Sequence, residues 1–331
     1  MSVKVSVICL VYNHEKFLER CLEGLVHQNT NFDYEIIVHD DCSTDSSRKI
    51  IETYVEKYPE LLVPQYEEQN QYSQGKEFVQ SKMQTKAQGI YFAFCEGDDY
   101  WCDNNKLQIQ YDYMEQHPEC SMCVHNTIRH DLMGDLEDSL FNDWTSEHVL
   151  SEKDVFFGWN VQTTSYFIRR EVAWRPDFAL PVWCGDYTWL TLAFDRGNIV
   201  SLPNVMSVYN YNNTNGLTYL NDKIDYRVKQ KKELIRAEYL KKYNQYTKYK
   251  YDNTIQSRIN QIHFDNKLLE VKCAYENHDS ISFRQRLNQL VKLPFYQELK
   301  KEGTLLQQCK RYLKYNLFFS YYLWVLRDKI R

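Results

Sequence analysis

The stretch Ile90–Trp101, which reads IYFAFCEGDDYW, decides how the chain is expected to fold. Its first six residues are apolar and favour a β conformation, so they predict a buried strand. Glu96, Asp98 and Asp99 follow where that strand ends. Adjacent carboxylates disfavour joint ionisation unless a cation neutralises them, and hard divalent cations prefer carboxylate oxygens. The stretch therefore indicates a Mg²⁺ or Mn²⁺ site that carries a phosphate-rich ligand; an acidic turn with a solvated face is the alternative.

On both sides of this stretch, strand and helix patterns alternate. Strands are expected at 3–11, 34–38, 61–66, 90–95 and 121–129, and helices at 15–28, from Ser43 or Thr44 to Pro59, at 76–88 and at 103–117. Further strands are expected at 161–168, 199–202 and 205–211, with an irregular connection at 140–160 and a helix that opens at Asp186. This alternation predicts an α/β sandwich with a mostly parallel sheet.

Polar side chains follow the first, second and fourth of these strands. They are Tyr12-Asn13, Asp40-Asp41 and Asp98-Asp99. Ligands of parallel sheets bind at the carboxyl ends of the strands, so we expect the three pairs to meet at one acidic edge. The chain contains neither G-x-G-x-x-G nor G-x-x-x-x-G-K-[ST], which disfavours a dinucleotide dehydrogenase and a P-loop enzyme.

Length and charge divide the chain into two parts. Its 331 residues, 43% hydrophobic and 26% charged, suit one large globular domain plus an extension. Residues 1–220 carry 16 basic and 33 acidic side chains, whereas residues 221–331 carry 24 basic and 12 acidic ones. We therefore expect a larger domain at 1–220 and a basic, helical C-terminal extension at 221–331, with different partners.

The ten cysteines form no dense disulfide framework, and Met1 leads into a strand without a signal peptide. We expect reduced thiols and a cytoplasmic protein. Cys120 and Cys123 form one C-x-x-C pair without a second pair at zinc-site spacing, which favours core thiols over a metal or redox site. His39 and His125 are also expected in the core rather than as metal ligands.

The order of the motifs resembles the family-2 glycosyltransferases of the GT-A fold. The matching pieces are VSVICLVYN at 5–13, EIIVHDDCSTD at 35–45, EGDDYW at 96–101 and GDYTW at 185–189, and the likeness covers roughly residues 3–217. The resemblance implies a nucleotide-sugar-binding sandwich and an inverting, Mn²⁺- or Mg²⁺-dependent transferase. It implies transfer from a UDP- or dTDP-sugar to a glycan or lipid-linked acceptor of a bacterial surface polysaccharide, such as a capsule.

The resemblance also implies roles for single residues. Asp98 would contact the ribose or the sugar, Asp99 would bind the metal on the donor diphosphate, and Asp186 would be the general base. The residues that would line the nucleotide pocket are Val11, Tyr12, Asn13 and Asp41. Asp41 would accept a hydrogen bond from the N3–H of uracil or thymine.

Several positions have a second interpretation. Asp186 at a helix start is also what an N-cap would look like. Trp101 would be either a shelf for an acceptor sugar or a core tryptophan. Thr163 and Thr164 would line the donor-sugar pocket, although threonines in a strand need no function.

The sequence departs from the family pattern in two places. Where many members carry an Ala-Arg-Asn-like segment, this chain has Lys82–Gln88, in which Lys82 or Lys86 would replace the arginine or be a surface charge. Glu96 and Gly97 stand where a third aspartate is common, so the metal is expected to rest on Asp99 and the phosphates alone.

The C-terminal stretch Leu317–Leu326 is ten residues long and rich in aromatic residues, with basic residues on both sides. A transmembrane helix needs about 20 apolar residues, so this stretch is not expected to span a membrane. It favours an interfacial helix on an anionic membrane surface, at the inner face of the membrane; docking on the first domain or on a dimer partner is the alternative. No nucleic-acid-binding signature accompanies the charge, so nucleic acid is not an expected partner.

Two other functions compete with sugar transfer. A sugar-1-phosphate nucleotidyltransferase would need a Gly-rich loop with Arg or Lys after the first strand, where this chain has Tyr12–Lys16. A catalytically inert glycan-binding or assembly protein on the same fold is the alternative from another class.

Overall fold

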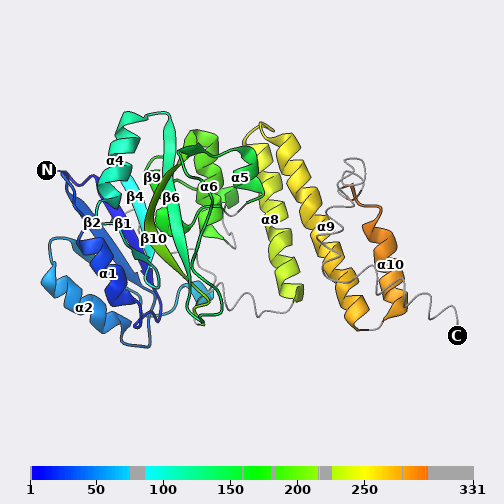
Figure 1. Cartoon of the computed structure of the whole chain (residues 1–331), viewed down its shortest axis with the longest axis horizontal. Helices are drawn as coiled ribbons and strands as arrows, with labels where there is room; N and C mark the ends of the chain where they lie inside the picture. Colours follow the sequence, from blue (N-terminus) through cyan, green and yellow to red (C-terminus); the bar gives the residue numbers. More distant parts are fainter. Residues whose placement is uncertain are drawn as a thin grey trace. The chain divides into compact units, whose positions relative to one another are not determined.

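The computed structural model describes residues 2–74, 86–158, 160–179, 184–214, 216, 226–277, 279–294 and 296. The chain divides into two compact units, Met1–Ile224 and Asp225–Arg331 (Figure 1). The boundary expected between residues 220 and 221 lies outside the described residues and stays a prediction.

The first unit is built on one sheet, which has ten strands in the described residues. Eight of them lie in the order β3-β2-β1-β4-β9-β6-β10-β5, while β7 pairs with β6 and β8 pairs with β10. The bounds are β1 Val5–Val11, β2 Tyr34–Asp40, β3 Leu62–Tyr66, β4 Tyr91–Glu96, β5 Tyr100–Trp101, β6 Cys120–Asp131, β7 Ser139–Leu140, β8 His148–Val149, β9 Phe167–Arg169 and β10 Asn198–Tyr211.

Two groups of strands are parallel. The first is β3, β2, β1 and β4, and the second is β6 and β10. The short strand β9 joins the two groups and is antiparallel to both β4 and β6. The prediction of an α/β fold with a mostly parallel sheet is therefore confirmed.

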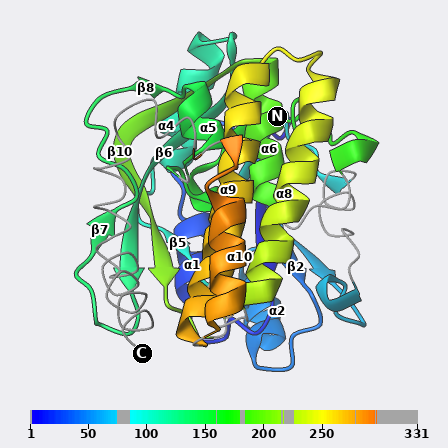
Figure 2. The same cartoon turned by 90° about the vertical axis from the view of Figure 1, so that its right-hand side faces the viewer.

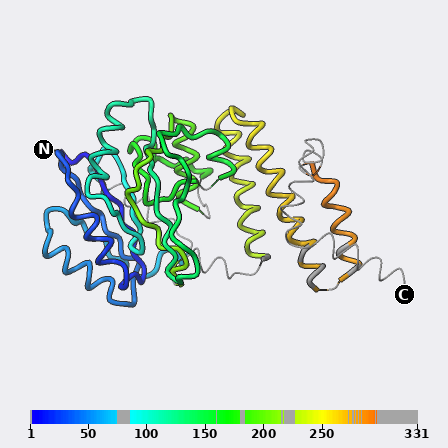
Figure 3. The backbone as a smooth tube through the Cα atoms, viewed as in Figure 1, coloured from blue at the N-terminus to red at the C-terminus, as the bar shows by residue number. Residues whose placement is uncertain are grey.

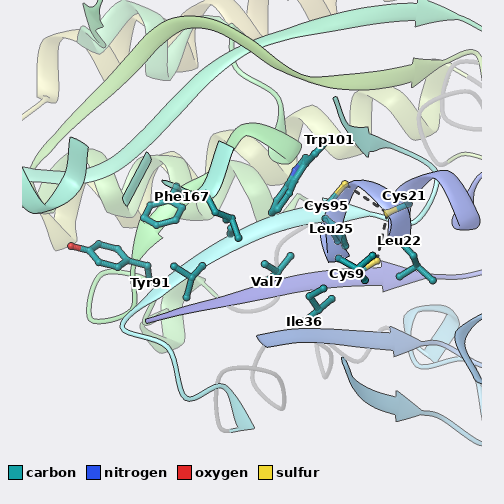
Figure 4. Close-up of a cluster of buried hydrophobic side chains, with 14 of the residues drawn as sticks. Val7, Cys9, Cys21, Leu22, Leu25, Ile36, Tyr91, Cys95, Trp101 and Phe167 are labelled. Carbon is teal, nitrogen blue, oxygen red and sulfur yellow. Dashed lines mark hydrogen bonds between the residues drawn. The ribbon is translucent and has the colours of Figure 1, made fainter. Parts of the chain in front are cut away.

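Helices cover both faces of this sheet. Their bounds are α1 Leu18–Val26, α2 Ser47–Lys57, α4 Lys106–Gln116, α5 Glu152–Phe156 and α6 Gly185–Arg196. Apolar side chains of α1, α2 and α4 share one core with Val5, Val7 and Cys9 of β1. Figure 4 shows the α1 part of this core, Cys21, Leu22 and Leu25, beside Val7 and Cys9. Phe94 of β4 instead packs on Trp189 of α6, with ring centroids 4.4 Å apart. Because neighbouring residues of a strand face opposite sides, these contacts place α6 on the other face.

The strand register brings the polar ends together. In the parallel pairs, Val11 lies opposite Asp40 and Leu10 lies opposite Glu96. The segments that follow β1, β2 and β4 therefore begin at the same edge of the sheet, as the positions of their polar residues indicated.

Some local predictions were wrong. The segment expected as a strand at 161–168 holds a 3₁₀ turn, η2 (Thr163–Ser165), before β9 begins. The two strands expected at 199–202 and 205–211 are one strand, β10, whose register against β6 shifts between Leu202 and Val205 and again before Ser207. The connection at 140–160 contains β8 and α5. The helix expected at 76–88 falls mostly outside the described residues.

The described cysteines are free thiols, and most are buried. Cys120 and Cys123 lie in β6, where burial raises the pKa of Cys123 to about 12. Figure 4 shows a second group, in which Cys21 of α1 lies 3.9 Å from Cys9 and 3.8 Å from Cys95, measured between sulfurs. The interpretation of these thiols as part of the core fits this packing.

The second unit is helical, as expected. It contains α8 (Tyr226–Tyr246), α9 (Asp252–Glu276) and α10 (Ser280–Leu290), which Figure 2 shows side by side and Figure 3 traces from yellow to orange. A small core joins Phe264, Val271 and Ala274 of α9 to Leu290 of α10. Among the described residues, no helix is long and apolar enough to cross a membrane. The stretch Leu317–Leu326 lies outside them.

Candidate active site

Three carboxylates gather where β4 ends. Glu96 is the last residue of β4, Asp98 and Asp99 lie in the turn that follows, and one oxygen of each lies within 4.8 Å of the others. In the part of the chain that the structure describes, this is the one cluster of three His, Cys, Asp or Glu side chains at metal-ligand spacing. Glu96 and Asp98 thus lie within reach of a metal on Asp99, and the expectation that the metal rests on Asp99 and phosphates alone stays a prediction.

The electrostatics of this cluster favour a cation. Asp99 is 1% exposed, and its Oδ1 accepts the backbone N–H of Asn210 at 2.9 Å. Its Oδ2 is buried and has no hydrogen-bond partner among the described residues. Burial, followed by the charges of Asp98 and Glu96, raises the pKa of Asp99 well above its ordinary value. Burial, followed by the charges of Asp98 and Asp186, raises the pKa of Glu96 to about 8. A buried, unpartnered carboxylate oxygen beside two more carboxylates fits a hard divalent cation.

The end of β10 fixes the acidic turn. The side-chain amide of Asn210 donates to the backbone oxygen of Asp98 at 2.6 Å, and that of Asn213 donates to Asp98 Oδ2 at 3.0 Å. Sequence reasoning missed both asparagines as site residues. The polar loop after the strand at 205–211 was the available signal, but nothing in the sequence pairs it with residues more than a hundred positions earlier.

His14 is a second residue that sequence reasoning missed. Its Nε2 lies 3.9 Å from Asp98 Oδ2, and its Nδ1 is buried without a hydrogen-bond partner in the described structure. A Cβ at position 97 would lie 2.8 Å from that Nδ1 and 3.0 Å from Val11 Cγ2. Gly97 therefore allows the acidic turn to approach the end of β1 closely, and this explains why a glycine stands where a third aspartate was considered.

The four residues expected in the nucleotide pocket lie near the same edge in different environments. Val11 is buried in the core, whereas Tyr12 is 45% exposed. Asn13 adopts a left-handed conformation with φ of 57°, and its Oδ1 accepts the backbone N–H of Thr44 at 2.7 Å. Asn13 thereby ties the segment after β1 to the segment after β2.

Asp41 is the fourth of these residues and is 6% exposed. Its carboxylate accepts the backbone N–H groups of Gln71 at 2.7 Å and Tyr72 at 3.1 Å. Partial burial, followed by the charges of Cys184 and Glu96, raises the pKa of Tyr72. Asp41 therefore fixes the start of the segment that begins at Gln71.

Asp186 lies in the first turn of α6. The N-cap position belongs to Cys184, so Asp186 is not the cap residue. Its Oδ2 accepts the hydroxyl of Thr163 at 3.1 Å, and its Oδ1 accepts the backbone N–H of Tyr187 at 2.9 Å and the thiol of Cys184. The charge of Asp186 also contributes to the raised pKa of Glu96.

Thr163, Thr164 and Trp101 do not share one environment. Thr163 holds Asp186, as described above. Thr164 is fully buried, with its hydroxyl 2.9 Å from Ser207 Oγ. Trp101 is 2% exposed and donates its indole N–H to the backbone oxygen of Thr164 at 3.0 Å. Trp101 and Thr164 thus lie in the core, where neither presents a surface to a sugar. This burial favours the interpretation of Trp101 as a core tryptophan.

The remaining candidates lie away from the cluster. His39 contacts Glu67 at 3.3 Å, and His125 Nδ1 lies 2.8 Å from the backbone oxygen of Asn126. Burial lowers the pKa of His125 well below its ordinary value, so this ring is a neutral core histidine. Lys86 contacts Gln65, and Lys82 lies outside the described residues.

Comparison with known proteins identifies this arrangement. The model of the family described as glycosyl transferase family 2 matches residues 6–170. An uncharacterized protein of Mycobacterium tuberculosis is 33% identical over 207 residues, which are 62% of this chain and 58% of that protein. The chain thus spans less than two thirds of the length of this relative.

Two further similar proteins are named for an activity. A poly(ribitol-phosphate) beta-N-acetylglucosaminyltransferase, TarS of Staphylococcus aureus, is 36% identical over 99 residues, 30% of this chain and 17% of TarS. The structure of TarS residues 1–349 with UDP-GlcNAc matches with a TM-score of 0.54 at 19% identity, covering 91% of this chain and 92% of that one. A mannosyltransferase of Pyrobaculum calidifontis, solved with GDP-Man and Mn²⁺, matches with a TM-score of 0.56 at 14% identity, covering 92% and 81%.

At such low identities, the structural matches show the fold, which is the GT-A sandwich that the motifs implied. The family model spans β1, β2 and β4 and the acidic turn, together with η2 and β9. The chain belongs to glycosyl transferase family 2.

Proposed function

We propose that this protein is a metal-dependent, inverting glycosyltransferase. It moves a sugar from a UDP- or dTDP-sugar to a glycan or lipid-linked acceptor in the synthesis of a surface polysaccharide. The observation that carries the proposal is the buried Oδ2 of Asp99, which has no hydrogen-bond partner in the described structure and lies in a cluster of three carboxylates. Asp41 follows β2, whose end lies at the same edge of the sheet, and the charge of Asp186 acts on Glu96 of the cluster.

The comparisons support the donor and the kind of product. TarS was solved with UDP-GlcNAc and is named for transfer to poly(ribitol-phosphate), and the mannosyltransferase was solved with GDP-Man and Mn²⁺. A nucleotide-sugar donor and a divalent cation are thus bound by proteins of the same fold. We choose a uracil or thymine donor because Asp41, a buried acceptor, suits a base that presents an N3–H.

In this proposal each group has one task. Asp186 takes the proton of the acceptor hydroxyl as its oxygen forms a bond to the anomeric carbon. The bond from that carbon to the diphosphate oxygen breaks, and the nucleoside diphosphate leaves with its electron pair, so a single displacement inverts the configuration. A cation held by Asp99, with Glu96 and Asp98, would supply Lewis-acid stabilisation of the leaving diphosphate.

Other residues position these groups. Thr163 and Cys184 orient the carboxylate of Asp186, and Asn210 and Asn213 orient the acidic turn. Asp41 fixes the segment at Gln71 and Tyr72, which would border the base.

A thermal-shift panel of UDP, dTDP, GDP and CMP, each with and without Mn²⁺, tests the proposal. A ligand at 100 times its Kd stabilises the native state by about 2.7 kcal/mol, so we expect UDP or dTDP with Mn²⁺ to raise Tm by several degrees. Asp99→Asn should abolish the rise. Asp112→Asn, which changes an exposed carboxylate on α4, should retain it.

The outcomes separate the competing functions. No shift with any nucleotide, with or without Mn²⁺, would contradict the donor site. A Mn²⁺-dependent shift together with release of UDP in the presence of an acceptor supports sugar transfer. Release of pyrophosphate from a nucleoside triphosphate and a sugar-1-phosphate would instead identify a nucleotidyltransferase, and binding without turnover of any donor would identify the inert protein.

A further inference from the structure

The connection between β7 and η2 lines an open hollow that contains none of the residues assigned to the donor site. Its volume is about 710 Å³, which lies within the range of about 300–1,000 Å³ for small-ligand pockets. The residues that line it include Phe141, Asn142, Asp143, Trp144, Asp154 and Asn160.

Trp144 forms a braced aromatic platform in this hollow. Its ring stacks on His148, with centroids 4.0 Å apart and an interplanar angle of 19°. His148 Nε2 lies 3.0 Å from Asp154 Oδ2, and Asp154 is itself held by the capping box that it forms with Ser151 at the start of α5. The orientation of Trp144 is thus fixed before any ligand arrives, which lowers the entropy lost on binding.

Two polar groups beside this platform have no partner in the described structure. The carboxylate of Asp143 makes no hydrogen bond or ion pair with a described residue, and neither does the indole N–H of Trp144. An aromatic face packs against the apolar face of a sugar ring, while free donors and acceptors at its rim pair with hydroxyl groups. The hollow therefore has the chemistry of a carbohydrate subsite.

The charge of the hollow selects against anions. Asp143 and Asp154 line it, whereas none of the described lining residues is a lysine or an arginine. Residues 1–220 as a whole carry 16 basic and 33 acidic side chains. A polyanion such as poly(ribitol-phosphate), for which TarS is named, would be repelled from such a surface.

The hollow is tied to the segment that positions the candidate base. Asn142 Nδ2 donates to the backbone oxygen of Asn160 at 2.9 Å. Asn160 precedes Thr163 by three residues, so their Cα atoms lie at most about 11 Å apart. Because the hydroxyl of Thr163 binds Asp186, residues 160–163 connect the lining of the hollow to the partner of the candidate base.

We infer that this hollow binds a sugar ring of an uncharged acceptor glycan, with Trp144 as the stacking platform and Asp143 as an acceptor for its hydroxyl groups. The inference rests on the proposed function and deepens it, because it assigns the acceptor class to residues outside the donor site. An uncharged acceptor would also distinguish this chain from TarS, which is named for transfer to poly(ribitol-phosphate).

Saturation-transfer NMR without any donor tests the inference. The probes are methyl glucopyranosides, galactopyranosides and N-acetylglucosaminides, their disaccharides, and poly(ribitol-phosphate). We expect at least one neutral sugar to bind and poly(ribitol-phosphate) not to bind. Trp144→Ala should weaken binding of that sugar by about tenfold or more, Trp144→Phe should preserve most of it, and Asp143→Asn should weaken it severalfold.

Matched variants control for folding and for surface effects. Trp174, which is 71% exposed and does not line the hollow, provides the control Trp174→Ala. Trp144→Ala should also retain the Tm rise with UDP or dTDP and Mn²⁺, because no donor residue is changed. Sugar binding that Trp144→Ala leaves intact, no binding of any neutral probe, or preferential binding of poly(ribitol-phosphate) would each overturn the inference. Failure of the nucleotide shift with sugar binding intact would instead contradict the donor site and leave the hollow as a glycan site.

Discussion

At the scale of single residues, the candidate base is distinguished by how it is held. Asp186 accepts hydrogen bonds from Thr163, Cys184 and the backbone of Tyr187, and its charge acts on Glu96. A carboxylate in the first turn of α6 also interacts favourably with the helix dipole. These contacts fix the orientation of the carboxylate, as a general base requires.

Asp186→Asn removes the base but keeps the shape of the side chain. We expect the rate of sugar transfer to fall by about 10²–10⁴-fold, the usual contribution of a positioned general base, while the Tm rise with UDP and Mn²⁺ persists. Thr163→Val should lower kcat by about tenfold with little change in the donor KM, because it removes one hydrogen bond that orients Asp186. Transfer is measured as acceptor-dependent release of nucleoside diphosphate. Wild-type turnover by a folded Asp186→Asn variant would show that the base is another group.

The sequence indicated the carboxylates of the site but not the side chains that support them. Asp41, Asp98 and Asp99 were indicated because each follows a strand, whereas the role of Asp186 was implied by the family resemblance, and all four roles stay predictions. Asn210 and Asn213 were missed because their role depends on β10 lying beside β5 and the acidic turn, an antiparallel pairing between distant segments. Hydrophobic periodicity predicts elements, but it carries no information about which distant elements pair.

At the scale of elements, η2 links the core to the site. Trp101 binds the backbone oxygen of Thr164, and the amide of Gln110 on α4 donates to the backbone oxygen of Ser165 at 2.9 Å. The turn that presents Thr163 to Asp186 is thus fixed from behind by buried side chains. A β-rich, threonine-containing segment predicts a strand, and this tertiary anchoring explains why the prediction failed at 161–168.

Lys106, the first residue of α4, is the least expected member of that core. It is fully buried, its Nζ donates to Gln110 Oε1 at 2.6 Å, and it lies 4.0 Å from the centroid of the Trp101 ring. Burial lowers the pKa of Lys106 to about 7, well below the value of 10.5 for an exposed lysine. The unfolded chain therefore binds a proton that the native state lacks at every pH between these two values.

This difference predicts how Lys106→Met changes the pH dependence of stability. Stability rises with pH wherever the unfolded state binds more protons. The titration of Lys106 should therefore raise the wild-type free energy of unfolding by about 2 kcal/mol as the pH rises from 7 to 9. Lys106→Met has no such titration. The free energy of unfolding of the variant, relative to that of the wild type, should therefore fall by about 2 kcal/mol from pH 7 to pH 9. Urea denaturation of both proteins at several pH values measures it. Parallel stability curves would show that Lys106 titrates normally in the native state.

At the scale of the whole molecule, the two units differ in charge and in content. Every described residue assigned to the donor site or to the hollow lies in the first unit, Met1–Ile224. Residues 221–331 carry 24 basic and 12 acidic side chains, and the six basic residues that flank Leu317–Leu326 belong to this excess. The charge pattern of the sequence therefore indicated that the two parts have different partners. The hydrophobic periodicity of the helices in the basic part carries no information about what that part binds.

We expect the full chain to co-sediment with anionic liposomes and a chain that ends at residue 303 to remain in the supernatant. Each basic residue near an anionic membrane surface contributes about 1 kcal/mol of attraction, and the aromatic residues of Leu317–Leu326 would insert at the interface. Both chains should retain the Tm rise with UDP and Mn²⁺, since the deletion leaves the first unit intact. Binding should weaken as salt is added, because salt screens the attraction, and liposomes of neutral lipid should bind neither chain. A full chain that ignores anionic liposomes would favour docking on protein, and equal binding of the two chains would locate the membrane contact outside residues 304–331.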